Sequence, residues 1–117
     1  MSVTNNTTNA IITFLNVSGH MAWRNSTVGT FDPTTKRMRT AHPTARGTAD
    51  IVCCLKGGQY FEIEIKTGKD RMSPQQEKHR GDVLASGGIY IVARTYDDFR
   101  IQYDNIMKGM HNGKVAE

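Results

Sequence analysis

Two carboxylates and an amine are spaced along the chain so that they could serve phosphodiester chemistry. Asp50 precedes one strand-like segment, Glu64 and Lys66 end the next, and only a Gly-Gly turn separates the two segments. Carboxylate oxygens bind hard divalent cations, and an ammonium group can stabilise charge that builds up on a phosphate. The set therefore indicates a site where a divalent metal, a scissile phosphate and an attacking water could meet.

The length of the turn decides whether Asp50 joins this site. A two-residue loop at Gly57-Gly58 would pair Asp50 with Ile65 and turn the carboxylate to the opposite face of the sheet. A three-residue loop that ends with Gly58 in the left-handed conformation pairs Asp50 with Glu64 instead. The longer loop also pairs apolar residues with one another, namely Ile51 with Ile63 and Cys53 with Phe61. We therefore predict the three-residue loop.

Residues 59–66 alternate between polar and apolar side chains. One face of the predicted strand carries Tyr60, Glu62, Glu64 and Lys66, and the other carries Phe61, Ile63 and Ile65. We expect the apolar face to pack on the core and the charged face to point outward or into a cleft. Glu62 lies one strand step further from the open end than Glu64, so we interpret it as a solvated charge and not as a ligand.

The composition indicates one domain of 117 residues. No apolar run approaches membrane-spanning length, so no membrane partner is expected. Cys53 and Cys54 are adjacent in a predicted strand and point to opposite faces, which favours two free thiols in a reducing cytoplasm. The four histidines are dispersed along the chain, and this spacing is not that of a zinc site.

Positive charge is concentrated in the segment before Asp50. Residues 1–23 contain no charged side chain, whereas residues 24–46 carry five basic residues against the single acid Asp32. A basic segment that leads into a metal site suits a polyanion such as DNA, although the segment by itself could equally be a solvated loop. The loop after Lys66 adds basic residues that could contact phosphates or merely keep the loop soluble. The candidate DNA contacts are Arg24, Lys36, Arg37, Arg39, Arg46, Lys69 and Arg71.

The coarse order of elements is helix, three strands, helix, strand, helix. The pattern predicts a helix over 6–17, a strand over 20–24, an irregular segment over 25–46, strands over 50–55 and 59–66, a helix over 73–86, an apolar strand over 89–93, and a helix from about 96 to 109. Gly29, Pro33 and Pro43 are expected to exclude regular structure from the irregular segment. Trp23 is expected in the core, with Arg24 pointing the other way toward solvent.

This αβββαβα order is that of the restriction-endonuclease-like PD-(D/E)XK core, an α/β (α+β) fold with a mixed sheet flanked by helices. Within this order the chain resembles the virus-type replication-repair nuclease (VRR-NUC) family over about residues 6–100. The domain is expected to span 1–117, with a frayed tail over about 111–117. The motifs that carry the resemblance are Ala22-Trp23-Arg24-Asn25, Gly47-Thr48-Ala49-Asp50, Glu64-Ile65-Lys66, Ser73-Pro74-Gln75-Gln76, Gly87-Gly88 and the segment from Arg94 to Phe99.

The resemblance implies a DNA endonuclease that hydrolyses phosphodiester bonds and depends on Mg²⁺ or Mn²⁺. It implies that Asp50, Glu64 and the backbone carbonyl of Ile65 are metal ligands, and that Lys66 and Gln76 are further catalytic residues. Small stand-alone members of the family are typically phage-encoded, which implies the cytoplasm of a bacterial host. Some of them act as homodimers on branched DNA of the Holliday-junction type.

Two positions leave alternatives open. Gln76 is also the third residue of a capping box that starts at Ser73, and we do not expect one amide to hold both roles. Family members usually carry a first-helix Glu at the metal site, whereas the alignment places the uncharged Asn6 there. A DNA-binding module with weak or lost catalysis therefore remains an alternative, as do a flap or single-strand nuclease and a restriction-type enzyme.

A homodimer is also expected from the first helix. Its apolar side chains exceed the number that one buried stripe needs, and two symmetric cuts require two sites. The alternative is that this helix is buried within one domain.

Overall fold

The computed structural model describes residues 2–25, 30–39 and 42–111. A four-stranded mixed sheet lies at its centre, in the order β1-β4-β5-β6. The first three of these strands, β1 (Met21–Arg24), β4 (Ile51–Cys54) and β5 (Tyr60–Ile65), pair antiparallel with their neighbours, and β6 (Ile89–Ala93) runs parallel to β5. The parallel pair is possible because a helix connects β5 to β6.

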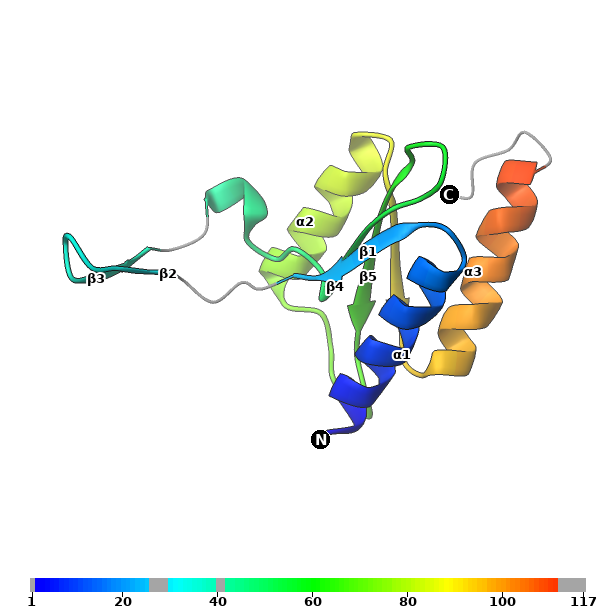
Figure 1. The fold of residues 1–117 in the computed structure, drawn as a ribbon, viewed down its shortest axis with the longest axis horizontal. Helices are drawn as coiled ribbons and strands as arrows, with labels where there is room; N and C mark the ends of the chain where they lie inside the picture. The colour runs from blue at the N-terminus through cyan, green and yellow to red at the C-terminus, as the bar shows by residue number, and fades with distance from the viewer. Residues whose placement is uncertain (1, 26–29, 40–41, 112–117) are drawn as a thin grey trace.

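Helices cover both faces of the sheet (Figure 1). The first helix, α1 (Val3–Val17), and the last, α3 (Tyr96–His111), pack on one face, and α2 (Pro74–Ala85) packs on the other. This arrangement confirms the predicted α/β architecture of a mixed sheet flanked by helices.

The predicted register between β4 and β5 is confirmed. Ile51 pairs with Ile63 and Cys53 pairs with Phe61. Leu55 N donates to Gln59 O over 2.9 Å, and this bond closes a three-residue loop. Gly57 and Gly58 have φ angles of 104° and 98°, which side chains other than glycine rarely adopt. The odd loop length keeps the apolar residues of both strands on one face.

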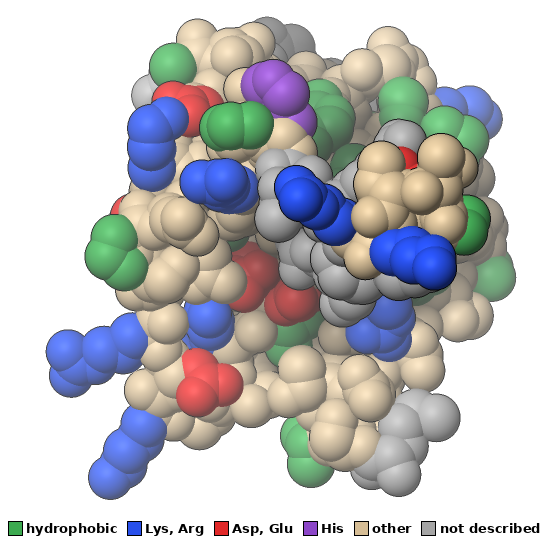
Figure 2. All heavy atoms as spheres, turned by 90° about the vertical axis from the view of Figure 1, so that its left-hand side faces the viewer, with side chains coloured by type: hydrophobic (Ala, Val, Ile, Leu, Met, Phe, Trp, Pro, Cys, Tyr) green, Lys and Arg blue, Asp and Glu red, His purple; other side chains and the backbone are tan. Residues whose placement is uncertain are grey.

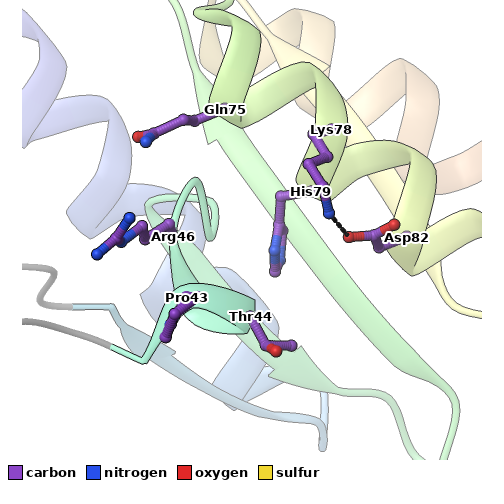
Figure 3. Close-up of a pocket in the computed structure, with 7 residues that line it drawn as sticks. All are labelled: Pro43, Thr44, Arg46, Gln75, Lys78, His79 and Asp82. Atoms are coloured by element: carbon purple, nitrogen blue, oxygen red, sulfur yellow. Dashed lines mark hydrogen bonds and ion pairs between the residues drawn. The ribbon is translucent and has the colours of Figure 1, made fainter.

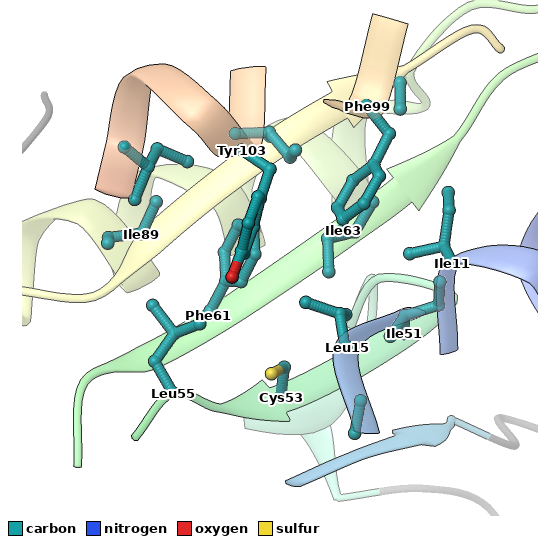
Figure 4. Close-up of a cluster of buried hydrophobic side chains, with 14 of the residues drawn as sticks. Ile11, Leu15, Ile51, Cys53, Leu55, Phe61, Ile63, Ile89, Phe99 and Tyr103 are labelled. Atoms are coloured by element: carbon teal, nitrogen blue, oxygen red, sulfur yellow. The ribbon is translucent and has the colours of Figure 1, made fainter. Parts of the chain in front are cut away.

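That apolar face forms the main core (Figure 4). Ile51, Phe61 and Ile63 of the sheet are fully buried beneath the two helices of this face. Ile11 and Leu15 of α1 and Phe99 of α3 complete the cluster, and Phe14 joins the helices through an edge-to-face contact with Tyr103, with ring centroids 5.1 Å apart. The apolar residues of α1 are therefore mostly used within one domain, which favours the alternative to a dimer surface. Val3 and Val17, at 72% and 83% exposure, are exceptions.

The segment expected to be irregular contains regular structure, so that prediction was wrong. A hairpin of β2 (Thr30–Asp32) and β3 (Arg37–Arg39) projects from the sheet, and a 3₁₀ helix (Pro43–Ala45) follows it (Figure 1). Pro33 lies in the turn of the hairpin, and Pro43 is the first residue of the 3₁₀ helix. Neither position needs a backbone N–H from the proline. Gly29 lies outside the described residues.

The boundaries of two helices and the place of Trp23 also differ from the expectations. The first helix begins at Val3 because Ser2 Oγ accepts from Asn5 N at 3.1 Å and caps it. The last helix continues through Gly109 to His111, and the rest of the tail lies outside the described residues. Trp23 is 47% exposed and does not lie in the core, because α2 packs on β6 and bonds to Glu62 and Glu64 of β5 rather than covering β1. Within the described ranges, no helix combines the length and apolar character needed to cross a membrane.

Candidate functional site

The two carboxylates that the sequence singled out lie against each other where β4 begins and β5 ends. Asp50 directly precedes β4, and its backbone N donates to Glu64 Oε1 over 3.1 Å. Its side-chain Oδ2 accepts from the backbone N of Ile65 over 2.9 Å. Each carboxylate thus accepts a hydrogen bond from the main chain of the other segment. The spacing of the two carboxylates therefore follows from the strand register.

Lys66 and Gln76 both approach the same oxygen of Glu64. Lys66 Nζ lies 3.4 Å from Glu64 Oε2, and Gln76 Nε2 donates to this oxygen over 2.9 Å. The other end of the Gln76 amide, Oε1, accepts from Ser73 N over 2.9 Å, while Ser73 Oγ accepts from Gln76 N over 3.2 Å. One amide thus caps the helix and contacts the candidate site, while its catalytic role stays a prediction. An amide carries its acceptor and its donors on opposite sides, so Gln76 can cap α2 and hold Glu64 at the same time.

Glu64 carries a strongly perturbed carboxyl group. Its side chain is almost fully buried, and this burial, with the neighbouring charge of Asp50, raises its pKa to about 7. Lys66 opposes the shift without cancelling it. The site therefore holds more negative charge than its own ammonium group balances, and a cation beside the two carboxylates would stabilise both.

Glu62 is not a solvated charge, so that interpretation was wrong. Its carboxylate is fully buried beneath α2. Oε1 accepts from Ala49 N over 2.9 Å, Oε2 lies 2.9 Å from His79 Nε2, and the Tyr60 hydroxyl donates to Oε2. Alternation along β5 correctly placed Glu62 on the face of Glu64, but it did not show that a helix covers this part of the face.

A cavity of about 310 Å³ lies beside this buried pair, between the 3₁₀ helix and α2 (Figure 3). Arg46 and Lys78 line it together with His79, and Lys78 Nζ lies 3.0 Å from Asp82 Oδ2. His79 Nδ1 has no hydrogen-bond partner among the described residues.

The chain returning from the hairpin is fixed against the start of α2 by Gly47. Its φ is +82°, and a Cβ at this position would lie 2.4 Å from the carbonyl oxygen of Gln75. Only glycine permits this approach. The contact sets the path by which the chain arrives at Asp50.

The basic candidates lie around this end of the sheet. Lys36 and Arg37 are exposed on the projecting hairpin, and Arg46, Lys69 and Arg71 are exposed on the connecting segments. Figure 2 shows this face, with Lys and Arg side chains in front of and around acidic side chains at its centre. The Arg39 side chain lies outside the described part.

Arg24 is exposed and is held by α1. Its Nη2 donates to Asn9 Oδ1 over 2.8 Å, and its Nη1 lies 3.5 Å from Asn5 Oδ1. The guanidinium therefore spans the gap between the edge strand and the first helix.

Asn6 lies on the outer side of α1. It is exposed, and it lies two residues, about 200° around the helix, from Thr8, which is buried. The residue of α1 that meets the segment after Lys66 is Thr4, whose Oγ1 lies 3.2 Å from Thr67 Oγ1. Asn6 therefore lies on another side of α1 than Thr4 and Thr8, and its place at the metal site stays a prediction.

Arg94 is a residue whose role sequence reasoning missed. Its Nη1 donates to the backbone oxygens of Asp70, Gly68 and Lys66 over 2.8, 3.3 and 3.4 Å. It thereby braces the loop that follows Lys66. A basic residue at the end of the buried strand β6 was the available signal, because β6 is adjacent to β5 in the sheet.

Within the described ranges, no three His, Cys, Asp or Glu side chains gather as a metal site, and the candidate centre holds the two carboxylates of Asp50 and Glu64. Comparison of the chain with protein-family models, curated proteins and solved structures gave no match.

Proposed function

We propose that this chain is a divalent-metal-dependent DNA endonuclease of the VRR-NUC type, with the PD-(D/E)XK core arrangement. The observation that carries the proposal is the convergence of Asp50, Glu64 and Lys66 at one end of the sheet, with Gln76 bracing Glu64. Two carboxylates and an ammonium group held by neighbouring strands suit metal-assisted hydrolysis of a phosphodiester.

The donor set fits Mg²⁺ or Mn²⁺. Asp50 and Glu64 supply hard anionic oxygens, and the backbone carbonyl of Ile65 between Glu64 and Lys66 is the third proposed ligand. The raised pKa of Glu64 supports this fit, because burial and the neighbouring charge of Asp50 both disfavour its ionised form, and a bound cation would offset both. When bound, the ion would acidify the attacking water and neutralise charge on the phosphate.

The chain's own side chains have separate roles in this proposal. Lys66, with a side chain only 14% exposed, orients the water and stabilises the negative charge of the transition state. Gln76 holds the Glu64 carboxylate in a fixed orientation toward Asp50 and Lys66. Neither role requires the absent first-helix acid.

DNA is the proposed substrate because exposed cations lie beside the carboxylates. Lys36 and Arg37 extend from the body on the hairpin, where they can reach phosphates beyond the cleavage point. Each such contact adds affinity through counterion release. A projecting arm suits branched DNA, in which the duplexes leave the cleavage point in different directions.

The test is a metal-dependent cleavage panel on linear, flap, splayed and four-way DNA. We expect nicking in Mg²⁺ or Mn²⁺, none in EDTA, and a preference for branched substrates. Binding of DNA without cleavage in either metal would support the binding module and contradict the endonuclease. Cleavage of linear DNA at one sequence, as fast as cleavage of branched DNA, would indicate a restriction-type enzyme.

We further propose that the working form is a symmetric homodimer. One domain of this size offers one metal centre and cuts one strand, whereas a four-way junction needs two symmetric cuts. Sedimentation at micromolar concentration should therefore give twice the 13.1 kDa mass of the chain. A monomer that still places paired nicks in four-way junctions would contradict the dimer. A monomer that makes single nicks would identify a flap-type or single-strand nuclease.

The double role of Gln76 gives a prediction with an internal control. Ser73→Ala and Gln76→Ala each remove half of the capping box, and each should lower the free energy of unfolding by about 1 kcal/mol. Gln76→Ala alone also removes the donor to Glu64, and should reduce metal-dependent cleavage by about 10- to 100-fold. Urea denaturation and cleavage rates measure the two effects. An equal loss of cleavage in both variants would show that Gln76 acts only as a cap.

A further inference from the structure

The only tryptophan of the chain stands half exposed on β1, an edge strand of the sheet. Trp23 pairs with Val52 on β4, and Val52 pairs with Glu62 on β5. Partners across neighbouring strands project to the same face, and so do residues two apart on one strand. Trp23 therefore shares the face of Glu62 and Glu64.

Trp23 is also close to the candidate centre along this face. Asp50 lies two residues before Val52, so it is the diagonal neighbour of Trp23, and such neighbours lie roughly 7–8 Å apart. Asn25, two residues after Trp23, donates its backbone N to Asp50 O over 2.8 Å, which ties the two chain segments together. The backbone of Trp23 thus lies one diagonal step from Asp50, on the face that carries the carboxylates.

The backbone that carries the indole is held in place from α1. Asn16 Oδ1 accepts from Ala22 N over 2.9 Å, and Asn16 Nδ2 donates to Ala22 O over 3.0 Å. Next to Trp23 on the other side, Arg24 is bound to Asn9. The side chain of Asn16 therefore occupies the free edge of β1, and the strand that carries the indole is fixed. Because this backbone is already fixed, binding at the indole requires no ordering of the strand.

We propose that Trp23 is a stacking site for an unpaired nucleobase of the DNA substrate, next to the phosphate that is cut. This inference rests on the proposed nuclease function. Aromatic side chains stack on bases of any sequence once these are out of the duplex stack. The basic hairpin leads the phosphate backbone to the same end of the sheet. The site therefore selects DNA with unpaired bases at the cleavage point, such as a junction, a flap or a single strand.

The indole itself reports on the interaction, because all tryptophan fluorescence of the chain comes from Trp23. With the metal chelated, so that no strand is cut, single-stranded and four-way DNA should quench the emission of the wild-type protein. A blunt duplex bound to the same saturation should quench it much less. DNA binding is followed independently by the anisotropy of a dye on the DNA.

Three variants of β1 separate stacking from general apolar contact. Trp23→Ala should weaken binding of single-stranded and four-way DNA by about 10- to 100-fold. Trp23→Tyr, which keeps an aromatic face, should restore most of it. Met21→Ala is the matched control, because Met21 is exposed on the same face but lies one strand step further from the carboxylates. It should leave binding unchanged.

The other outcomes overturn the inference in distinguishable ways. DNA that binds and is cut without changing the emission would remove the stacking site and leave the nuclease proposal standing. Emission that changes with protein concentration alone, with both Trp23→Ala and Met21→Ala lowering the sedimenting mass, would make this face a contact between two copies. Absence of both binding and cleavage would remove the nuclease proposal and this inference with it.

Discussion

Glu64→Gln is expected to reduce metal-dependent DNA cleavage by about 1,000-fold or more while the protein stays folded. The substitution keeps the size of the side chain but removes an anionic oxygen from the proposed metal centre. The fold should tolerate this change, because the pKa of Glu64 of about 7 means that the folded protein accepts a neutral carboxyl group near neutral pH. Cleavage rates and circular dichroism of the same preparation measure the two parts.

The matched control is Glu77→Gln, which makes the same chemical change at an exposed position of α2. Glu77 lies 3.9 Å from Arg80 and is not among the groups that hold Glu64, so cleavage should be unchanged. Mg²⁺ should raise the melting temperature of the wild type and of Glu77→Gln, but not of Glu64→Gln. Normal cleavage by Glu64→Gln would show that the metal is bound elsewhere.

The pH profile of the wild type provides a second check. Protons compete with the cation for Glu64, and its pKa is raised from the usual value of a glutamate to about 7. Cleavage at limiting Mg²⁺ should therefore increase as pH rises through about 7, and excess Mg²⁺ should move this increase to lower pH. A rate that is flat between pH 6 and 8 at limiting metal would contradict the assignment.

The centre of the sheet could be predicted because two local rules agree there. The period of two fixes which side chains of β5 share a face, and the glycines of the turn permit the loop length that pairs Ile51 with Ile63. These rules were sufficient to bring Asp50 to Glu64. The helices α2 and α3 were recognisable for a similar reason, because a cap residue marks the start of each.

What the sequence could not provide is the part of each face that a helix covers. Trp23 and Glu62 lie on one face of the sheet, yet the glutamate is buried and the tryptophan is half exposed. The difference depends on where α2 crosses the sheet, and the mostly polar sequence of α2 does not reveal this. The burial tendency of each residue type therefore predicts a buried tryptophan and an exposed glutamate, which is the reverse of what the structure has.

The hairpin was missed because Gly29, Pro33 and Pro43 were interpreted only as breakers. Asp32 Oδ1 accepts from Thr34 N over 2.9 Å, so the segment around Pro33 forms a tight turn and not a disordered loop. Turn residues flanked by short strands give weak periodicity. A hairpin of three-residue strands therefore has little signal beyond its turn.

Glu62→Ala is expected to lower the free energy of unfolding by about 3–5 kcal/mol, although Glu62 lies only two residues from Glu64. Its carboxylate is the acceptor for Ala49 N and for the Tyr60 hydroxyl, and it pairs with His79 Nε2. Removing it leaves Ala49 N and His79 Nε2 buried beneath α2 without an acceptor, and it also leaves a cavity. Urea denaturation monitored by circular dichroism measures the loss.

Glu62→Gln distinguishes lost hydrogen bonds from lost charge. The amide keeps an oxygen for Ala49 N, and the imidazole of His79 can exchange tautomers so that Nε2 accepts from the amide. This variant should therefore lose less than half of the stability that Glu62→Ala loses. If the free energy of unfolding of Glu62→Ala lies within about 1 kcal/mol of the wild-type value, water replaces the carboxylate. The contact between Glu62 and His79 then does not hold α2 on the sheet. If instead Glu62→Ala loses the expected stability while Glu64→Gln keeps its stability and loses cleavage, the two glutamates have separate roles. Glu62 then stabilises the fold, and Glu64 serves the chemistry of the site.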